Sequence, residues 1–303
     1  MTALQNLNWK MKVRAWWEGY DLSGLQQKQK KPLIQASEQE QDDTGGKISP
    51  FWSRERIKVN EAVFGEGHVT PTTPDHIAAL IKPMGLDNEK TVLDIGTGLG
   101  GVTRYMGREG GAWVEGVEDD PVLAYAGMLR SRKAGIEKKA PISPHEFDTL
   151  SPGKKYDAIF SKEVFLQIKN KEDLFAFIRS SLKERGHLCF TDYVFKHSQK
   201  PDEKVREWLA EEEPRPHLWS ISQYTDMMFG LGFDIRITED ISDKHRSMIM
   251  ASWAEIPEPL VALGKKNSVV QGMIVEEAER WMRRVAAIDT GDVRVYRFYA
   301  LGP

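Results

Sequence analysis

Hydrophobic positions alternate between strand-like and helix-like patterns from about residue 50 onward. Short apolar runs predict strands at 91–95, 112–118, a short stretch ending near 147, 156–161, 187–193, 233–238 and 293–300. Apolar residues at helical spacing predict helices at 52–64, 75–84, 101–109, 121–134, 171–184, 220–231 and 272–287, the last within a mostly helical stretch before the final strand. This alternation is typical of right-handed βαβ units and a mostly parallel sheet.

The N-terminal part has a different pattern. Residues 8–20 carry tryptophans and a tyrosine at helical spacing with basic residues between them, which predicts an amphipathic helix, and residues 22–50 have the polar composition of a linker. We therefore expect an N-terminal segment at 1–50 and one folded domain at 51–303. The helix packs on the domain or on a second subunit of a homo-oligomer, closes over a substrate site, or contacts a membrane surface.

Composition narrows the function classes. The 303 residues carry a net charge of −3, which argues against a nucleic-acid binder. The single cysteine, Cys189, fits a reducing compartment, and neither a signal peptide nor a membrane span is visible, so we expect a cytoplasmic protein. The seven histidines and one cysteine form no ligand-spaced set, so no metal is predicted.

A glycine-rich turn follows the first predicted strand of the domain. Asp94 lies near the end of that strand, and Gly96, Gly98 and Gly100 or Gly101 lead into a helix. Glycines let the backbone approach a ligand closely, and the helix N-terminus offers N–H groups to it. This spacing also fits a dinucleotide fingerprint, so the glycines alone leave the cofactor open.

Acidic residues at the ends of the next strands help to choose between the possible cofactors. Glu118 ends the second strand, with Asp119 beside it. Its carboxylate fits the hydroxyls of an adenosine ribose, a group that both a nicotinamide dinucleotide and S-adenosylmethionine contain. Asp148 and Thr149 end the predicted third strand, where a carboxylate can accept from an adenine amino group. Asp94 distinguishes between the two cofactors. A carboxylate at this position repels the pyrophosphate of a dinucleotide and suits the ammonium of a methionine moiety.

Together these residues resemble a class I S-adenosylmethionine-dependent methyltransferase from about residue 55 to the C-terminus. The resemblance implies an α/β, Rossmann-like sheet of seven strands, mostly parallel with an antiparallel last strand, and helices on both faces. Segments 233–238 and 293–300 are then the closing strands, and a helical cap comes from the N-terminus and from residues 240–290. The implied cofactor is S-adenosylmethionine, with S-adenosylhomocysteine as product.

Several segments are similar to the phosphobase, or phosphoethanolamine-type, methyltransferases. They are Val63–Thr70, Ser161–Ile168, Thr191–Tyr193, Arg215 with His217, Trp281 with Arg283 and Arg284, and Phe298–Ala300. This resemblance implies cofactor contacts from Val69, Thr70 and Ser161. It implies a substrate-phosphate set that includes Tyr193, Arg215 and His217, with Arg283 or Arg284 in place of a lysine; the alternative for Arg215 is a surface ion pair.

The chain also departs from that family. The Tyr–His pair that closes the site there aligns with Asn60 and Gln167 here, and glutamine is no general base. The catalytic candidates are therefore His68, Gln167 and Tyr193, with His68 as a candidate base or a plain loop histidine.

The predicted function is methyl transfer to a small polar acceptor, with an amine nitrogen first, by direct displacement. Two alternatives keep the cofactor: a C- or O-methyltransferase for a hydrophobic or lipid-like acceptor, or a member that binds the cofactor without catalysis. A nicotinamide oxidoreductase is disfavoured by Asp94.

Overall fold

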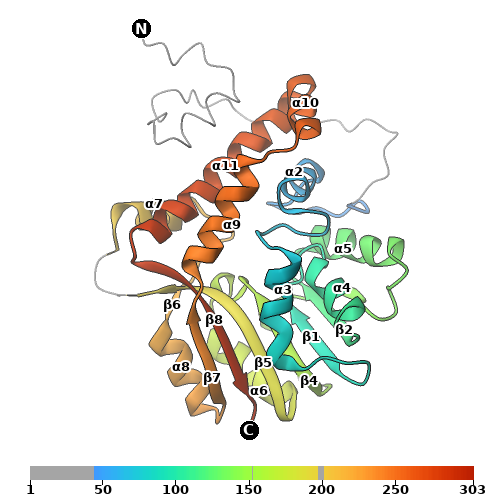
Figure 1. The fold of residues 1–303 in the computed structure, drawn as a ribbon, viewed down its shortest axis with the longest axis vertical. Helices are drawn as coiled ribbons and strands as arrows, with labels where there is room; N and C mark the ends of the chain where they lie inside the picture. The colour runs from blue at the N-terminus through green and yellow to red at the C-terminus, as the bar shows by residue number, and fades with distance from the viewer. Residues whose placement is uncertain (1–43, 152, 197–200) are drawn as a thin grey trace.

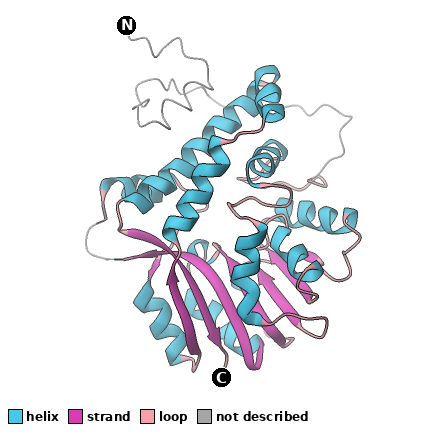
Figure 2. Cartoon of the chain, viewed as in Figure 1, coloured by secondary structure: helices cyan, strands magenta, loops and turns pink. Residues whose placement is uncertain are grey.

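The computed structural model describes residues 44–151, 153–196 and 201–303. The predicted helix at 8–20 and most of the predicted linker lie outside this part of the chain. Within it, one layer of strands lies between helices, with a second group of helices above one edge of the sheet (Figure 2).

The sheet has the predicted architecture. Its strands are β1 (Thr91–Ile95), β2 (Trp113–Glu118), β3 (Ile142–Pro144), β4 (Tyr156–Lys162), β5 (Leu182–Phe195), β6 (Trp219–Ser220), β7 (Asp234–Asp240) and β8 (Val293–Leu301). Their order is β3-β2-β1-β4-β5-β8-β7, with the two-residue β6 beside β5. Strand β8 runs antiparallel to both β5 and β7, and the other pairs are parallel. The predicted mostly parallel sheet with an antiparallel last strand is confirmed.

Helices cover both faces of this sheet, because its central strands are apolar on both sides. One face is covered by α3 (Pro74–Ile81, continued by the 3₁₀ turn Lys82–Met84), α4 (Gly101–Arg108) and α5 (Pro121–Lys133). The other is covered by α6 (Lys171–Ser181) and α8 (Ile221–Gly230), whose Phe175 and Tyr224 pack on Phe190.

A helical cap lies above the edge where the parallel strands end (Figure 1). It consists of α2 (Arg54–Phe64), α7 (Glu203–Glu211), α9 (Ser242–Ala254), α10 (Glu258–Lys266) and α11 (Ser268–Asp289). Its own core centres on Phe64, Trp253 and Trp281, and the rings of Phe64 and Trp281 lie 4.9 Å apart. The cap expected from residues 240–290 is therefore present, and α2 joins it.

Some element boundaries differ from the prediction. Strand β3 ends at Pro144, which has no N–H to extend the ladder, and residues 147–149 form a 3₁₀ turn instead of a strand end. Strand β5 begins at Leu182, within the predicted helix, because Leu182 pairs with Tyr156 before a bulge. Helix α7 was not predicted; Val205 and Trp208 bury its apolar side.

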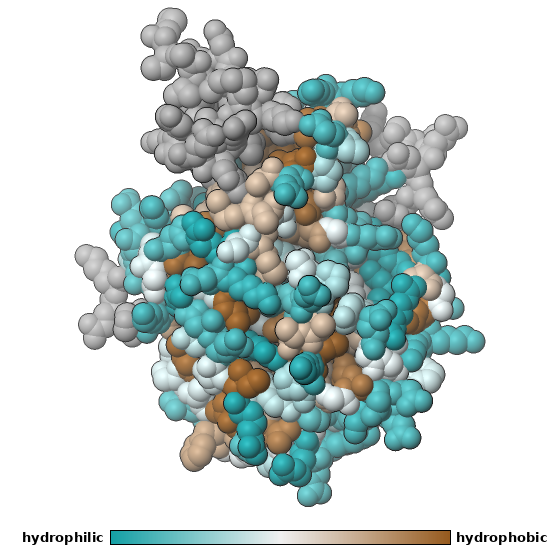
Figure 3. Space-filling model, viewed as in Figure 1, coloured by the Kyte–Doolittle hydropathy of each residue, from teal (hydrophilic) through white to brown (hydrophobic). Residues whose placement is uncertain are grey.

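The surface in Figure 3 is mainly hydrophilic, with hydrophobic side chains scattered among polar ones. In the part of the chain that the structure describes, no helix has the length and apolar character that a membrane crossing requires.

Candidate active site

The glycine turn after β1 is shaped by backbone geometry. Gly96, Gly98 and Gly100 have φ angles of 76°, 54° and 75°, in the left-handed region that favours glycine. A Cβ on Gly96 would lie 2.3 Å from Val164. The turn therefore needs glycine both for its dihedral angles and for its close packing, and it ends where α4 begins at Gly101.

Asp94 lies beneath this turn and is buried. Its Oδ2 accepts a hydrogen bond of 2.6 Å from the Thr103 hydroxyl on α4. Burial raises the pKa of Asp94 to about 7, although the Thr103 hydrogen bond opposes the shift. The carboxyl group is thus poised to gain its charge when a cation is bound nearby.

Glu118, at the end of β2, is tied to the same turn. Its Oε2 accepts from the Gly98 N–H at 2.7 Å, and its Oε1 accepts from the Asp120 N–H at 3.2 Å. Burial raises its pKa to about 7 despite these backbone donors. The side chain is held in one orientation, with Asp120 capping the N-terminus of α5 beside it.

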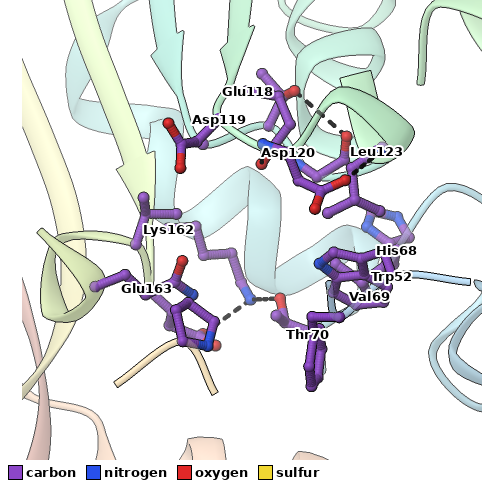
Figure 4. Close-up of a pocket in the computed structure, with 18 of the residues that line it drawn as sticks. Trp52, His68, Val69, Thr70, Glu118, Asp119, Asp120, Leu123, Lys162 and Glu163 are labelled. Carbon is purple, nitrogen blue, oxygen red and sulfur yellow. Dashed lines mark hydrogen bonds and ion pairs between the residues drawn. The ribbon is translucent and has the colours of Figure 1, made fainter. Parts of the chain in front are cut away.

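These groups open into a cavity of about 490 Å³ between the carboxyl edge of the sheet and the cap. Figure 4 shows Glu118, Asp119 and Asp120 on one side of it, His68, Val69 and Trp52 on another, and Lys162 reaching towards Thr70 and Glu163. The remaining lining includes Phe51, Phe147, Phe160, Val164, Gln167, Glu213, Pro214, Arg280, Trp281 and Arg284. The cavity is thus polar at the strand ends and aromatic beneath the cap.

A buried charged pair follows β4 at this cavity. The Lys162 ammonium lies 2.8 Å from Glu163 Oε1 and donates to the Thr70 hydroxyl at 2.7 Å. Glu163 has a φ angle of 59°, unusual for a residue with a Cβ, and its Oε2 is buried without a hydrogen-bond partner among the described residues. Burial would raise the pKa of Glu163, but His245 and Lys162 outweigh it and keep the pKa below the ordinary value. The cavity is therefore lined by a carboxylate with one oxygen that has no hydrogen-bond partner among the described residues.

Basic residues on α11 are paired within the protein. Glu212 accepts from Arg280 Nε at 2.7 Å and from Arg284 Nε and Nη2 at 2.9 Å each. Glu212 also accepts from the Trp208 indole N–H at 2.6 Å. Burial opposes ionisation of Glu212, yet the two guanidinium groups hold its pKa well below the usual range. This cluster joins α11 to the end of α7 as one rigid wall of the cavity.

The structure brings about half of the predicted site residues to the cavity. They are His68, Val69, Thr70, Asp94, Gly96, Gly98, Glu118, Asp119, Gln167 and Arg284. Burial and Lys162 lower the pKa of His68 to about 4, so its ring is neutral at physiological pH and packs over Gly101.

The other predicted residues lie outside the cavity lining. They are Gly100, Asp148, Thr149, Ser161, Tyr193, Arg215, His217 and Arg283. Asp148 and Thr149 are exposed because the chain leaves β3 early. The Ser161 hydroxyl donates a hydrogen bond of 2.8 Å to the Ile95 carbonyl. Arg215 is exposed and His217 accepts from Lys171 through its carbonyl, so the structure does not assemble the expected phosphate set at the cavity.

The cavity is also lined by residues to which the sequence assigned no role. They are Phe51, Trp52 and Arg280, together with Lys162, Glu163 and Trp281, which the sequence showed only as parts of family-like segments. One signal was available, since two adjacent charges interrupt the apolar run from Ala158 to Leu166. Asn60, where the related family has a tyrosine, is buried and donates to Glu277 Oε2 at 3.1 Å. In the described part of the chain, no group of three or more His, Cys, Asp or Glu side chains is arranged to hold a metal ion.

A glycine turn, a ribose-type glutamate and an antiparallel closing strand define the architecture of the class I, Rossmann-like methyltransferases. Residues 71–236 match the family described as "Methyltransferase domain", which is more than half of the chain. The chain belongs to this family, and the predicted class, an S-adenosylmethionine-dependent methyltransferase, is confirmed.

Individual relatives are more distant. The phosphoethanolamine N-methyltransferase of Plasmodium falciparum is 27% identical over 194 residues, covering 63% of this chain and 71% of that protein. Other curated relatives of the same name are longer, and the match spans only 36% to 44% of them. The similarity to phosphobase methyltransferases is thus confirmed, at low identity.

Solved structures share the fold. Phosphoethanolamine N-methyltransferase 2 of Haemonchus contortus, in complex with phosphomonomethylethanolamine and S-adenosylhomocysteine, superposes with a TM-score of 0.70 at 22% identity, over 82% of this chain and 57% of that one. Geranyl diphosphate C-methyltransferase from Streptomyces coelicolor superposes with a TM-score of 0.61 at 18% identity, over 99% of both chains. The fold is thus common to enzymes with different acceptors.

Proposed function

We propose that this protein transfers the methyl group of S-adenosylmethionine to an amine nitrogen of a small polar acceptor. One observation carries the proposal: a buried carboxylate, Glu163, lines the cavity that also contains the glycine turn, and one of its oxygens has no hydrogen-bond partner among the described residues. A carboxylate in that position favours binding of a cationic amine and stabilises the positive charge of its methylated product.

The lining residues fit the cofactor. The turn at Gly96 and Gly98 admits a ligand close to the backbone, Asp94 offers a carboxylate to the ammonium of the methionine moiety, and Glu118 offers one to the ribose hydroxyls. Val69 and Thr70 line the same cavity between this region and Glu163. When bound, the cofactor supplies a methyl group already activated by a positively charged sulfur.

The protein then has to orient the acceptor and exclude water. Holding a nucleophile in line with the methyl group can supply about 7–11 kcal/mol of a bimolecular barrier. The aromatic rings of Trp52 and Trp281 line the cavity and exclude water under the cap. Glu163 orients the amine, which loses its proton to solvent before the site closes. Its lone pair then forms the new N–C bond while the bond between the methyl group and the cofactor sulfur breaks.

The test measures methyl transfer to a panel of small primary, secondary and tertiary amines by mass spectrometry. The wild-type protein is expected to methylate at least one of them, and Glu163→Gln to lower kcat/KM by about 10- to 150-fold, the equivalent of about 1.5–3 kcal/mol for a charged hydrogen bond. Glu146→Gln, which neutralises an exposed glutamate, is the matched control. Tight cofactor binding without transfer to any amine would reject the amine acceptor.

A second candidate is C- or O-methylation of a hydrophobic or lipid-like acceptor. The aromatic lining by Phe51, Trp52 and Trp281 favours it, because these rings can pack on an apolar chain and stabilise a developing cation. Prenyl alcohols and prenyl diphosphates added to the same panel distinguish it from the first candidate.

The remaining alternative, a cofactor-binding protein without catalysis, predicts binding with no product in either group. It stays open because Asn60 and Gln167 replace the Tyr–His pair of the related family. The proposed membrane contact of residues 8–20 is tested by co-sedimentation with anionic liposomes, comparing the full chain with one lacking residues 1–24.

A further inference from the structure

We propose that Tyr193 and His245 form a buried pair that positions Glu163 for the acceptor. Here His245 and Tyr193 are positioning residues, since neither lines the cavity. The inference concerns how the acceptor carboxylate is held, and its catalytic consequence rests on the proposed function.

Three elements bring these side chains together. Tyr193 comes from β5, His245 from α9 in the cap, and Glu163 from the turn after β4. The Tyr193 hydroxyl lies 2.7 Å from His245 Nε2, and His245 Nδ1 lies 3.3 Å from Glu163 Oε1. The three side chains therefore lie in line from the sheet, through the cap, to the cavity. Tyr193 and His245 share a hydrogen bond, whereas His245 Nδ1 approaches Glu163 Oε1 to 3.3 Å without one.

Burial determines the protonation states of Tyr193 and His245. Tyr193 and His245 are both 0% exposed. Burial lowers the pKa of His245 to about 4, in spite of the Glu163 carboxylate, and raises that of Tyr193. At neutral pH the imidazole is therefore uncharged and the phenol keeps its proton, and we take the phenol as the donor to His245 Nε2. The ring proton of His245 is then on Nδ1, the nitrogen that faces Glu163.

Other charges near His245 favour the same state. Lys162 already neutralises Glu163 at 2.8 Å. Arg284, from α11, and Lys162 both lower the pKa of His245, so a second positive charge beside Glu163 is disfavoured. His76, on α3, faces the same group and also has its pKa lowered to about 4, by burial and by Lys162 and Lys244.

The consequence is an oriented carboxylate. Lys162 and His245 both face Oε1, and Oε2 remains without a partner among the described residues. The left-handed backbone at Glu163 is strained, and such strain persists only where the surroundings fix it. Because His245 belongs to the cap, the position of this carboxylate depends on the cap being closed over the sheet.

Two substitutions of similar size separate the two hydrogen-bonding ends of the imidazole. His245→Asn places an amide N–H near the position of Nδ1, and His245→Gln places its amide near Nε2. We expect His245→Asn to keep kcat within about threefold of the wild-type value. His245→Gln should lower kcat by about 10- to 100-fold, the range typical of residues that orient a functional side chain. The Kd for S-adenosylmethionine should be unchanged in both. Equal losses in both variants, or a larger loss in His245→Asn, would contradict the positioning role.

A second measurement needs no acceptor. Nitrogen NMR of histidine-labelled wild-type protein at pH 7 should show His245 as the neutral tautomer with its proton on Nδ1. Glu163→Gln should shift that resonance and leave that of the half-exposed His187 unchanged. A proton on Nε2, or a charged ring, would overturn the inference. Failure of the amine panel together with the expected NMR result would reject only the proposed acceptor.

Discussion

The affinity for S-adenosylmethionine should fall steeply as the pH is lowered from 7.0 to 5.5. Asp94 and Glu118 are expected to act as carboxylates in the complex, but burial raises the pKa of each to about 7 in the ligand-free protein. A carboxyl group with a raised pKa loses its charge as the pH falls through that value. About half of each group is ionised at pH 7.0 and about 3% at pH 5.5, which predicts a loss of about sixteenfold per carboxylate and about 250-fold for both.

Calorimetric titration with S-adenosylmethionine at intermediate pH values measures this slope, and circular dichroism at each pH verifies that the protein stays folded. Glu118→Gln removes one ionisable group, so its affinity should be lower at pH 7.0 and should fall only about sixteenfold towards pH 5.5. Asp226→Asn is the matched control, because Asp226 is exposed and lies outside the cavity lining. An affinity independent of pH, or a slope in Glu118→Gln equal to that of the wild type, would refute the reasoning.

Three further predictions concern the turn and the cap. Gly96→Ala should abolish detectable cofactor binding and lower Tm, because the new Cβ adds left-handed backbone strain to a 2.3 Å overlap with a valine. Gly85→Ala is the control, since Gly85 also has a positive φ but has open space around it. This variant should change only the free energy of unfolding, by about 1–3 kcal/mol. Glu212→Gln should cost about 3–5 kcal/mol in urea denaturation, since it leaves two buried guanidinium groups uncompensated; a change below about 1 kcal/mol would show that the cluster is not required. Trp281→Ala should cost about 3–5 kcal/mol in the same assay, against less than about 1 kcal/mol for the half-exposed Trp113→Ala, and similar losses would contradict the packing described for the cap.

The cofactor side of the site was predictable because its signal is local. Asp94, Gly96 and Gly98 are close neighbours in sequence, and a strand followed by a helix fixes their relative positions. Glu118 follows from the next strand end, since parallel strands place their carboxyl ends at one edge of the sheet. Asp148 did not follow, because the length of an edge strand depends on where its ladder stops, here at Pro144.

The acceptor side was far less predictable. Arg215 and Arg283 were expected near a substrate phosphate and lie outside the cavity lining, whereas Glu163 and Arg280 lie in it. The hydrophobic periodicity of a helix shows which of its faces is buried, but it does not show which side chains reach a cavity. The partner of Arg284 is Glu212, which lies 72 residues away in the chain.

The sequence by itself determined the alternation of strands and helices, the glycine turn and the class of enzyme, since these depend on propensities and contacts within a few residues. Only the tertiary structure decided that Tyr193 lies behind the cavity, that His245 from the cap stands between it and Glu163, and that one oxygen of Glu163 has no hydrogen-bond partner among the described residues. The physical reason is that burial and pairing of charges arise when distant segments pack together. The same burial sets the protonation of each group.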